Sequence, residues 1–363
     1  MIHFCCHPNS LFTNVFSKIS QYFLEQGMNA KYSEIGSKLI DVKIQAFFSA
    51  KISNRIRHLL YTSVWNYRLL RTIRAGDIVW IYTNGEFISR IGLDASLEKA
   101  IKRKNARYIF QLPDAWPLFE KESKIQKGCE RRARMADLSA PVTPQLNRLL
   151  RDKYGNIPCE TCEEAFDTDV FNENDLTQDY TEKVVIWSGP PTKLDELEPL
   201  FPVFLEVYGK IPFKLRIISG ISRPNLSIPI PWEWLPFPGQ SQLSQAYQGA
   251  IAAIASYPRQ DEYGLCKGNY KIKNYMAAGK AIVTSPLGYN SSLINDGENG
   301  LFASGSDEWR DSLFRILTDE ALGKRLGRNA RETAIRRFSC SSIAAQYMRI
   351  LKQYFPAEMQ KTN

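Results

Sequence analysis

Short apolar runs alternate along the chain with segments in which apolar residues recur every three or four positions. The runs at 1–6, 76–83 and 106–112 are typical of buried strands, whereas 16–25 and 93–104 have helical spacing. Such alternation favours a parallel sheet covered by helices on both faces. The first part of the chain therefore predicts an α/β domain.

The same alternation resumes in the second half. Strands are predicted at 184–188, 215–219 and 281–284, and a helix is predicted over 194–208. Between the halves, at about 155–181, the chain is acidic and turn-rich and the periodicity lapses, which is typical of a connector. These patterns predict two similar α/β domains with a cleft between them.

The length of 363 residues also fits two domains better than one. We predict a first domain over 1–160 and a connector over 161–180. A second domain follows over 181–340, and a C-terminal helix over 341–363 packs back toward the first domain.

The net charge of the chain indicates which kinds of molecule it binds. The chain has 47 Lys and Arg residues against 38 Asp and Glu residues, a net charge of +9. Such a surface usually meets nucleic acid, acidic lipid headgroups or phosphorylated small molecules. No helix-turn-helix, zinc-finger or aromatic–basic sheet motif is present, so we do not expect nucleic acid as a partner.

Cysteine usage and hydropathy indicate the compartment. The seven cysteines are scattered and odd in number, which favours a reducing cytosol. Cys159 and Cys162 form a single CxxC without the further ligands of a zinc site, so no metal site is expected. No signal peptide or run of about eighteen apolar residues is visible. We predict a cytoplasmic protein, which can also attach peripherally to the inner face of the membrane.

Candidate phosphate ligands gather in the run 267–303. Lys267 and Lys271 stand at the start of a predicted helix, whose amide groups already attract anions. A second turn follows a predicted strand and consists of Gly288, Tyr289, Asn290, Ser291 and Ser292. Two such turns on successive strand–helix units suit a diphosphate. The alternative is an ordinary strand–helix turn with solvated lysines.

This run contains motifs in a spacing typical of one enzyme family. They are Lys267, Lys271, Tyr275-Met276-Ala277-Ala278-Gly279, Val283, Ser285, Gly288, Asn290 and Asp296-Gly297-Glu298-Asn299-Gly300. The run resembles the C-terminal half of family 4 glycosyltransferases, also called glycosyl transferases group 1. The agreement continues through the tail motifs at 326–331 and 337–339.

The resemblance implies the GT-B fold, in which two Rossmann-like domains face each other across a cleft. Its members transfer a sugar from a nucleoside-diphosphate sugar with retention, and need neither a bound metal nor another cofactor. The second domain then holds the donor. The implied phosphate ligands are Lys267, Lys271, Lys193, and the backbone amides of Ser188, Gly189 and 288–292.

Two positions depart from the family pattern. Many relatives carry two glutamates eight positions apart, where this sequence has Cys266 and Asn274. The amide of Asn274 can hydrogen-bond a ribose hydroxyl, but a thiol cannot replace a carboxylate. Asp261 or Glu262 is the alternative ligand for the sugar. A non-catalytic nucleotide-binding relative and a sugar-nucleotide epimerase or hydrolase therefore remain competing hypotheses.

Two residues of the first domain are candidates for catalysis at the acceptor. Asp114 follows a predicted strand and is placed to orient or deprotonate the acceptor hydroxyl. His7 ends the first strand, beside a loop that borders the acceptor site in GT-B proteins. The alternatives are a turn-capping role for Asp114 and a structural role for His7.

The segment 51–74 is basic and lacks acidic residues. Its arginines include Arg55, Arg57, Arg68, Arg71 and Arg74, interleaved with apolar side chains. A helix of this kind can lie on anionic lipid and bring the enzyme to a lipid-linked acceptor. A core-facing helix with a solvated cationic side is the alternative. The expected acceptor is a glycan or a lipid-linked molecule in polysaccharide or glycolipid assembly.

Overall fold

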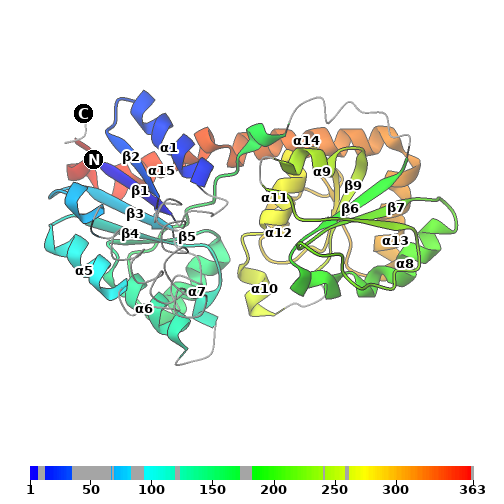
Figure 1. The fold of residues 1–363 in the computed structure, drawn as a ribbon, viewed down its shortest axis with the longest axis horizontal. Helices are drawn as coiled ribbons and strands as arrows, with labels where there is room; N and C mark the ends of the chain where they lie inside the picture. The colour runs from blue at the N-terminus through cyan, green and yellow to red at the C-terminus, as the bar shows by residue number, and fades with distance from the viewer. Residues whose placement is uncertain are drawn as a thin grey trace, which may run out of the picture. The chain divides into compact units, whose positions relative to one another are not determined.

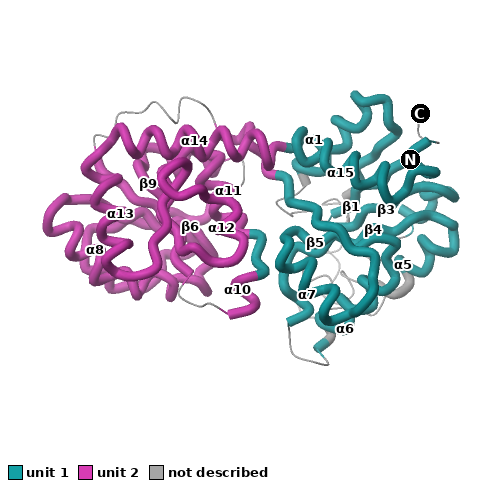
Figure 2. Tube along the Cα trace, turned by 180° about the vertical axis from the view of Figure 1, so that it is seen from behind, with its two compact units in different colours: residues 1–165, 266–268, 340–363 teal, residues 166–265, 269–339 magenta. Residues whose placement is uncertain are grey.

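The structure is a computed structural model that describes residues 1–6, 13–34, 67, 69–82, 94–118, 123–171, 182–239, 242–257 and 261–360. These residues form two compact units (Figure 2). The first unit contains residues 1–165, 266–268 and 340–363, and the second contains 166–265 and 269–339.

The first unit is built on a sheet of five parallel strands in the order β2-β1-β3-β4-β5 (Figure 1). The strands are β1 (Ile2–Cys6), β2 (Ala30–Glu34), β3 (Ile78–Tyr82), β4 (Arg107–Leu112) and β5 (Leu138–Pro141). The helices and 3-10 turns are α1 (Thr13–Glu25), α5 (Asp94–Arg103), η1 (Trp116–Leu118), α6 (Lys124–Met135), α7 (Pro144–Tyr154), α15 (Cys340–Tyr354) and α16 (Pro356–Gln360).

Local sequence fixes where helices of this unit begin and end. The Thr143 side chain accepts a hydrogen bond from the Leu146 amide, and Pro144 occupies the first turn of α7. Gly155, with φ of 76°, ends that helix. At the start of α6, the Ser123 side chain accepts a hydrogen bond from the Gln126 amide.

The late helix α15 completes the core of the first unit. The ring of Tyr347 stacks on that of Trp80 in β3, with centroids 4.2 Å apart. The Tyr347 hydroxyl also accepts a hydrogen bond of 2.8 Å from Gln111 in β4. Burial raises the pKa of Tyr347 well above its usual value, so the hydroxyl stays neutral.

The second unit has six parallel strands in the order β11-β10-β9-β6-β7-β8. The strands are β6 (Val184–Ser188), β7 (Lys214–Ile218), β8 (Trp232–Leu235), β9 (Ala250–Ala255), β10 (Ala281–Thr284) and β11 (Leu301–Phe302). The helices are α8 (Phe201–Tyr208), α9 (Leu243–Tyr247), α10 (Glu262–Cys266), α11 (Tyr270–Ala277), α12 (Asn290–Leu293), α13 (Ser306–Thr318) and α14 (Glu320–Phe338), and the 3-10 turns are η2 (Thr168–Val170), η4 (Pro191–Glu196) and η5 (Glu198–Leu200).

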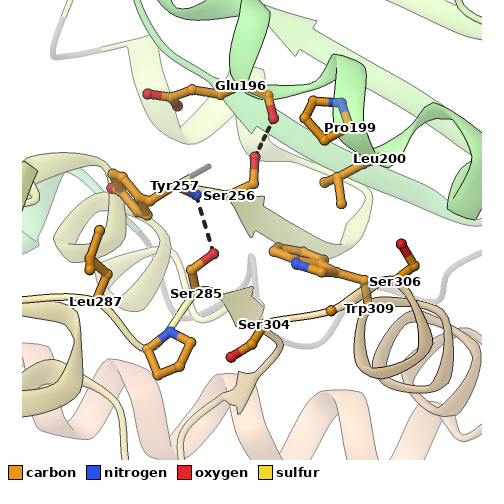
Figure 3. Close-up of a pocket in the computed structure, with 12 residues that line it drawn as sticks. Glu196, Pro199, Leu200, Ser256, Tyr257, Ser285, Leu287, Ser304, Ser306 and Trp309 are labelled. Atoms are coloured by element: carbon orange, nitrogen blue, oxygen red, sulfur yellow. Dashed lines mark hydrogen bonds between the residues drawn. The ribbon is translucent and has the colours of Figure 1, made fainter. Parts of the chain in front are cut away.

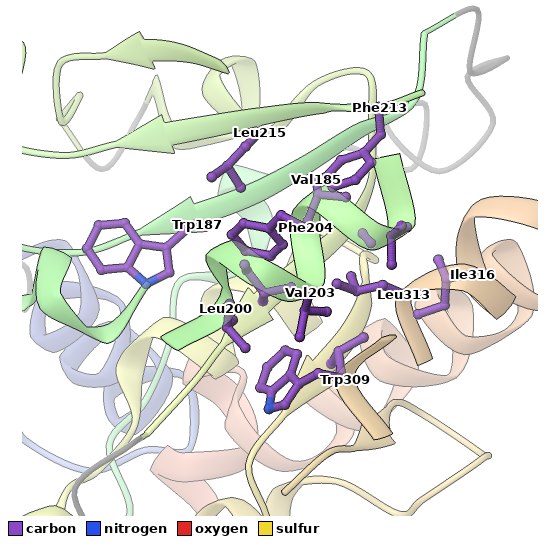
Figure 4. Close-up of a cluster of buried hydrophobic side chains, with 14 of the residues drawn as sticks. Val185, Trp187, Leu200, Val203, Phe204, Phe213, Leu215, Trp309, Leu313 and Ile316 are labelled. Carbon is purple, nitrogen blue, oxygen red and sulfur yellow. The ribbon is translucent and has the colours of Figure 1, made fainter. Parts of the chain in front are cut away.

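Both faces of the second sheet are buried. Val185 and Trp187 of β6 join one apolar cluster, which contains side chains of α8 and α13 (Figure 4). Val184 and Ile186 point to the other face and join a cluster with α9, α11 and α14. The alternation along one strand follows the period-2 geometry of a β-strand. The predicted α/β class is therefore confirmed, with two parallel sheets.

A close approach of backbones fixes α14 against the turn after α11. Gly279, with φ of 62°, ends the α11 segment as the sequence predicted. A Cβ atom at Gly327 of α14 would lie 2.1 Å from the Gly279 carbonyl oxygen. The buried guanidinium of Arg331 also donates to the carbonyl oxygens of Ala277 and Phe171. These contacts hold the helix that carries Lys271 in one position.

Candidate functional site

Lys271 lies in the first turn of α11, and its ammonium group meets a carboxylate and two aromatic rings. Its Nζ is 3.0 Å from Oε2 of Glu196, and the two side chains are only 14% and 9% exposed. The Nζ also lies 4.5 Å from the ring centroid of Trp187 and 5.8 Å from that of Tyr257. These distances are typical of cation–π contacts. The lysine is therefore held in place without a ligand.

Three segments that follow parallel strands build this cluster. Trp187 is the penultimate residue of β6, Glu196 ends the turn η4 that follows it, and Tyr257 comes just after β9. Since β6 and β9 are neighbours in the sheet, their carboxyl ends meet at one edge. Ligands of open α/β sheets bind at this edge.

Gly189 leaves room for the lysine. A Cβ atom at this position would lie 2.9 Å from Cη2 of Trp187 and 3.5 Å from Nζ of Lys271. A side chain at 189 would therefore displace the Trp187 ring. The sequence predicted Gly189 and Lys271 as parts of one site, and they do lie close together.

A cavity of about 170 Å³ adjoins the Lys271 cluster at the same sheet edge (Figure 3). It is lined by Glu196, Pro199, Leu200, Ser256, Tyr257, Ser285, Pro286, Leu287, Ser304, Gly305, Ser306 and Trp309. The Ser256 hydroxyl donates to the Glu196 carbonyl oxygen, and the Tyr257 amide donates to Ser285 Oγ over 3.2 Å. Glu196 and Tyr257 belong to both the cavity and the Lys271 cluster.

The backbone amides predicted at the end of β6 already donate hydrogen bonds within the second unit. The Ser188 amide donates to the Tyr275 hydroxyl over 2.7 Å, and the Gly189 amide donates to the Ile218 carbonyl over 3.1 Å. The Ser188 hydroxyl also lies 2.9 Å from that of Tyr247. Burial raises the pKa of both Tyr247 and Tyr275, so these hydroxyls remain neutral. A phosphate at these amides would have to replace the existing bonds.

The predicted turn at 288–292 is packed tightly. Gly288 has φ of 54°, and a Cβ atom there would lie 2.6 Å from the Leu265 carbonyl oxygen. The buried side-chain amide of Asn290 donates through Nδ2 to Thr284 Oγ1 over 3.2 Å and to the Ser285 carbonyl oxygen over 3.1 Å. The glycine therefore permits a close approach of protein backbone here.

The other members of this turn differ in exposure. Tyr289 is buried, and its ring centroid lies 5.4 Å from Nζ of Lys273. Ser291 and Ser292 are exposed, and the Ser292 hydroxyl donates to the Tyr289 carbonyl over 2.8 Å. Of the turn, only the serines present their side chains to solvent.

The remaining donor-side candidates have separate locations. Asn274 is buried in α11, and among the described residues its Oδ1 has no hydrogen-bond partner. Lys193 is half-buried on η4, and Cys266 is buried. Lys267 is half-buried and is grouped with the first unit, whereas Lys271 belongs to the second. The ligand roles of these residues stay predictions.

The acceptor-side candidates are only partly described. Asp114 is half-buried, and its Oδ1 accepts a hydrogen bond of 2.8 Å from the Ala115 amide. The contact is local to the turn, and the catalytic role of Asp114 stays a prediction. His7 lies outside the described residues, so its role stays a prediction.

The basic segment is likewise described in part. Arg55, Arg57 and Arg68 lie outside the described residues. Arg71 and Arg74 are exposed and line a surface cavity of about 490 Å³ in the first unit. No helix in the described part of the chain has the length and apolar character needed to cross a bilayer. Within the same residues, no group of three His, Cys, Asp or Glu side chains could hold a metal ion.

Sequence reasoning missed Glu196, whose carboxylate lies 3.0 Å from the ammonium of Lys271. A continuous helix over 194–208 was predicted, and on it Glu196 would be an ordinary polar position. The structure has two 3-10 turns before α8 begins at Phe201. Pro199 and Pro202 were the available signal, because proline lacks the amide that a helix interior requires.

Comparisons with known proteins agree with this architecture. Residues 218–349, less than half of the chain, match a family model described as glycosyl transferase-like. HepE from Anabaena, solved with UDP-glucose, aligns with a TM-score of 0.67 at 12% identity, over 97% of this chain and 99% of that chain. The chain has the GT-B fold.

Further solved structures align over nearly the whole chain. Sucrose-phosphate synthase from Thermosynechococcus elongatus has a TM-score of 0.63 at 14% identity, over 98% of this chain and 100% of that chain. A glycosyltransferase from Rickettsia africae has a TM-score of 0.63 at 12% identity, over 97% and 98%. A search of curated proteins gave no match. The predicted resemblance to group 1 glycosyltransferases is confirmed, and identities this low show the fold alone.

Proposed function

We propose that this protein is a retaining, metal-independent glycosyltransferase that uses a nucleoside-diphosphate sugar. One observation carries the proposal. A nearly buried lysine is fixed at the carboxyl edge of the second sheet, beside a cavity. The similarity of residues 218–349 to glycosyl transferase-like proteins supports the assignment, as does the likeness in fold to HepE solved with UDP-glucose.

In the proposed reaction, Lys271 stabilises the departing diphosphate. Negative charge develops on the leaving group in the transition state, and a fixed cation in a site of low polarity stabilises that charge strongly. The aromatic faces of Trp187 and Tyr257 hold the ammonium without neutralising it. An ammonium has three N–H donors, so Lys271 can bind a phosphate oxygen and Glu196 together.

Binding and turnover test this proposal in one series. Titration calorimetry with UDP, GDP, ADP and their sugars should give one nucleotide that binds the wild type with 1:1 stoichiometry. Turnover of the matching sugar with an acceptor library should persist in EDTA and keep the anomeric configuration. Loss of turnover on chelation, with recovery on adding magnesium, would contradict the metal-independent mechanism.

The buried thiol of Cys266 favours a second candidate, a nucleotide-binding protein without transferase activity. Cys266 is 3% exposed and stands where many relatives have a glutamate. Incubation with the best-binding donor, alone and with acceptors, separates the candidates. Nucleotide binding with no product under either condition supports the non-catalytic protein, whereas sugar release without an acceptor supports a hydrolase.

The proposed acceptor is a glycan or a lipid-linked molecule, which the enzyme reaches at the inner face of the membrane. The exposed cations Arg71 and Arg74 support it, because clustered arginines attract anionic lipid. Co-sedimentation with vesicles containing phosphatidylserine should fall with added salt and with Arg71→Glu plus Arg74→Glu. Binding that neither change affects would refute the membrane surface as a partner.

A further inference from the structure

The surface cavity of about 490 Å³ in the first unit lies at the amino edge of its sheet. Met1, Asn29 and Asp77 line it, and they directly precede β1, β2 and β3, three neighbouring strands (Figure 1). Each of these strands is five residues long, so the cavity lies about 16 Å from the carboxyl edge of the sheet. Asp114, the predicted acceptor residue, follows the carboxyl end of β4. The cavity is therefore separate from that candidate.

Three cationic side chains line this cavity from two segments that are distant in sequence. Lys31 is the second residue of β2, while Arg71 and Arg74 belong to the segment that leads into β3. All three residues are exposed. The Cζ atom of Arg71 lies 5.7 Å from the ring centroid of Tyr67, a distance typical of a cation–π contact. The fold thus brings an ammonium and two guanidinium groups to one cavity.

The carboxylate that lines the cavity is already engaged by other groups. Oδ1 of Asp77 lies 3.0 Å from the backbone nitrogen of Met1. Oδ2 lies 3.1 Å from Nε2 of His3 and accepts a hydrogen bond of 2.7 Å from the backbone amide of Arg74. Within the described residues, no carboxylate forms an ion pair with the three cationic side chains. The cavity therefore has an excess of positive charge, which a bound anion would balance.

A phosphate group is the anion that suits this set of donors. Guanidinium groups bind phosphate through two parallel N–H bonds, and an ammonium adds further donors. A phosphomonoester carries a charge of about −1.5 to −2 at pH 7, so it balances more positive charge than a carboxylate does. The cavity volume falls within the range of roughly 300–1,000 Å³ that is typical of small-molecule sites. The cavity can therefore hold an organic group attached to the phosphate.

We infer that this cavity binds the phosphate group of a free phosphorylated metabolite or of a lipid headgroup, and that Lys31, Arg71 and Arg74 hold that phosphate. The inference goes beyond the proposed function, because this site needs neither a nucleotide sugar nor Lys271. It also differs from a diffuse attraction of arginines to a membrane, since binding at one cavity is saturable and involves Lys31 of β2.

Binding of sn-glycerol 3-phosphate is the first arm of the test, measured by calorimetry at low ionic strength. The wild type should show saturable binding. Lys31→Gln and Arg74→Gln each remove one exposed cation, so each should raise the dissociation constant about threefold to fivefold, and the double variant about tenfold or more. Arg103→Gln is the matched control. It removes the same charge from an exposed position of the first unit outside the cavity, and should leave the dissociation constant nearly unchanged.

Vesicles form the second arm and identify the source of the phosphate. Phosphatidylcholine vesicles with phosphatidic acid present the same phosphomonoester on a lipid, whereas vesicles with oleate at equal surface charge present a carboxylate. The difference in co-sedimentation between the two measures recognition of the lipid phosphate. Binding of glycerol phosphate alone identifies a free metabolite as the ligand, and binding of phosphatidic acid alone identifies a headgroup. Either result supports the site if Lys31→Gln and Arg74→Gln weaken binding more than Arg103→Gln does.

Other outcomes overturn the site. They are the absence of phosphate binding in both arms, and binding that Lys31→Gln and Arg74→Gln weaken no more than Arg103→Gln does. Loss of glycerol phosphate binding in folded Lys271→Met would also overturn it, because the phosphate would then have bound in the second unit. If glycerol phosphate binds as expected and no nucleotide binds the wild type, the proposed function fails and this site stands.

Discussion

Replacing Lys271 by Met separates its structural role from its role in binding. The distance between Lys271 Nζ and Glu196 Oε2 is 3.0 Å, and at an effective dielectric constant of 20 this corresponds to an attraction of about 5.5 kcal/mol. Desolvation offsets part of that attraction. Removing one partner of a buried pair still costs about 3 kcal/mol, because the other charge is left without compensation. We therefore expect Lys271→Met to lower the free energy of unfolding by about 3 kcal/mol.

The double variant Lys271→Met plus Glu196→Gln should recover most of this stability. It removes the uncompensated carboxylate, so its free energy of unfolding should lie within about 1 kcal/mol of wild type. Nucleotide binding should not recover, since the cation is still missing. Loss of a charge-assisted bond to phosphate corresponds to a Kd raised about tenfold or more.

Denaturant unfolding followed by tryptophan fluorescence measures the free energy of unfolding. Calorimetry with the best nucleoside diphosphate measures the Kd. Both are run at one fixed ionic strength. The matched control is Lys193→Met, a half-buried lysine on η4 whose loss should leave stability nearly unchanged. Equal stability of the single and double variants, together with wild-type nucleotide affinity in the double variant, would refute this account of Lys271.

Three further predictions concern stability. Gly327→Ala places a Cβ 2.1 Å from the Gly279 carbonyl oxygen, and this overpacking should lower the free energy of unfolding by about 1–3 kcal/mol, measured as a lower Tm. An unchanged Tm would mean that α14 can shift freely. Arg132→Met leaves the Glu98 carboxylate buried without the guanidinium that lies 2.8 Å from it, and should lower the free energy of unfolding by about 3–5 kcal/mol. Adding Glu98→Gln should recover most of that stability. Burial lowers the pKa of His3, and this effect outweighs the hydrogen bond to the Asp77 carboxylate, which raises that pKa. Unfolded chains then bind more protons below about pH 6.5, stability falls as pH drops, and His3→Gln should flatten that slope between pH 5 and 7.

The sequence predicted the strands that are rich in β-branched and aromatic residues. The runs that became β3, β6 and β10 stand out because such residues favour strands. The strand β9 (Ala250–Ala255) was not predicted, because its four alanines give little β signal and its burial depends on the packing of both sheet faces. Local pattern therefore identified most of the sheet, and tertiary packing determined the rest.

The candidate site was predictable only where one continuous segment carries the signal. Lys271 and the turn at 288–292 belong to one run of sequence, and the family resemblance identified both. Glu196 lies 75 residues from Lys271 in the chain, and the sequence contains no mark of that ion pair. The internal hydrogen bonds of the Ser188 and Gly189 amides were equally hidden, because their partners come from distant strands and helices.

The return of α15 to the first unit has a consequence for biosynthesis. Tyr347 covers Trp80 and bonds to Gln111, yet it is made 236 residues after Gln111 and later still after Trp80. A ribosome that has translated residues 1–165 has produced every strand of the first sheet, but the helix that closes its core is still missing. The second unit, complete at residue 339, is therefore the first that can finish folding on the ribosome. The nascent N-terminal sheet must wait with an aromatic surface uncovered, a state in which chaperones would be expected to engage it.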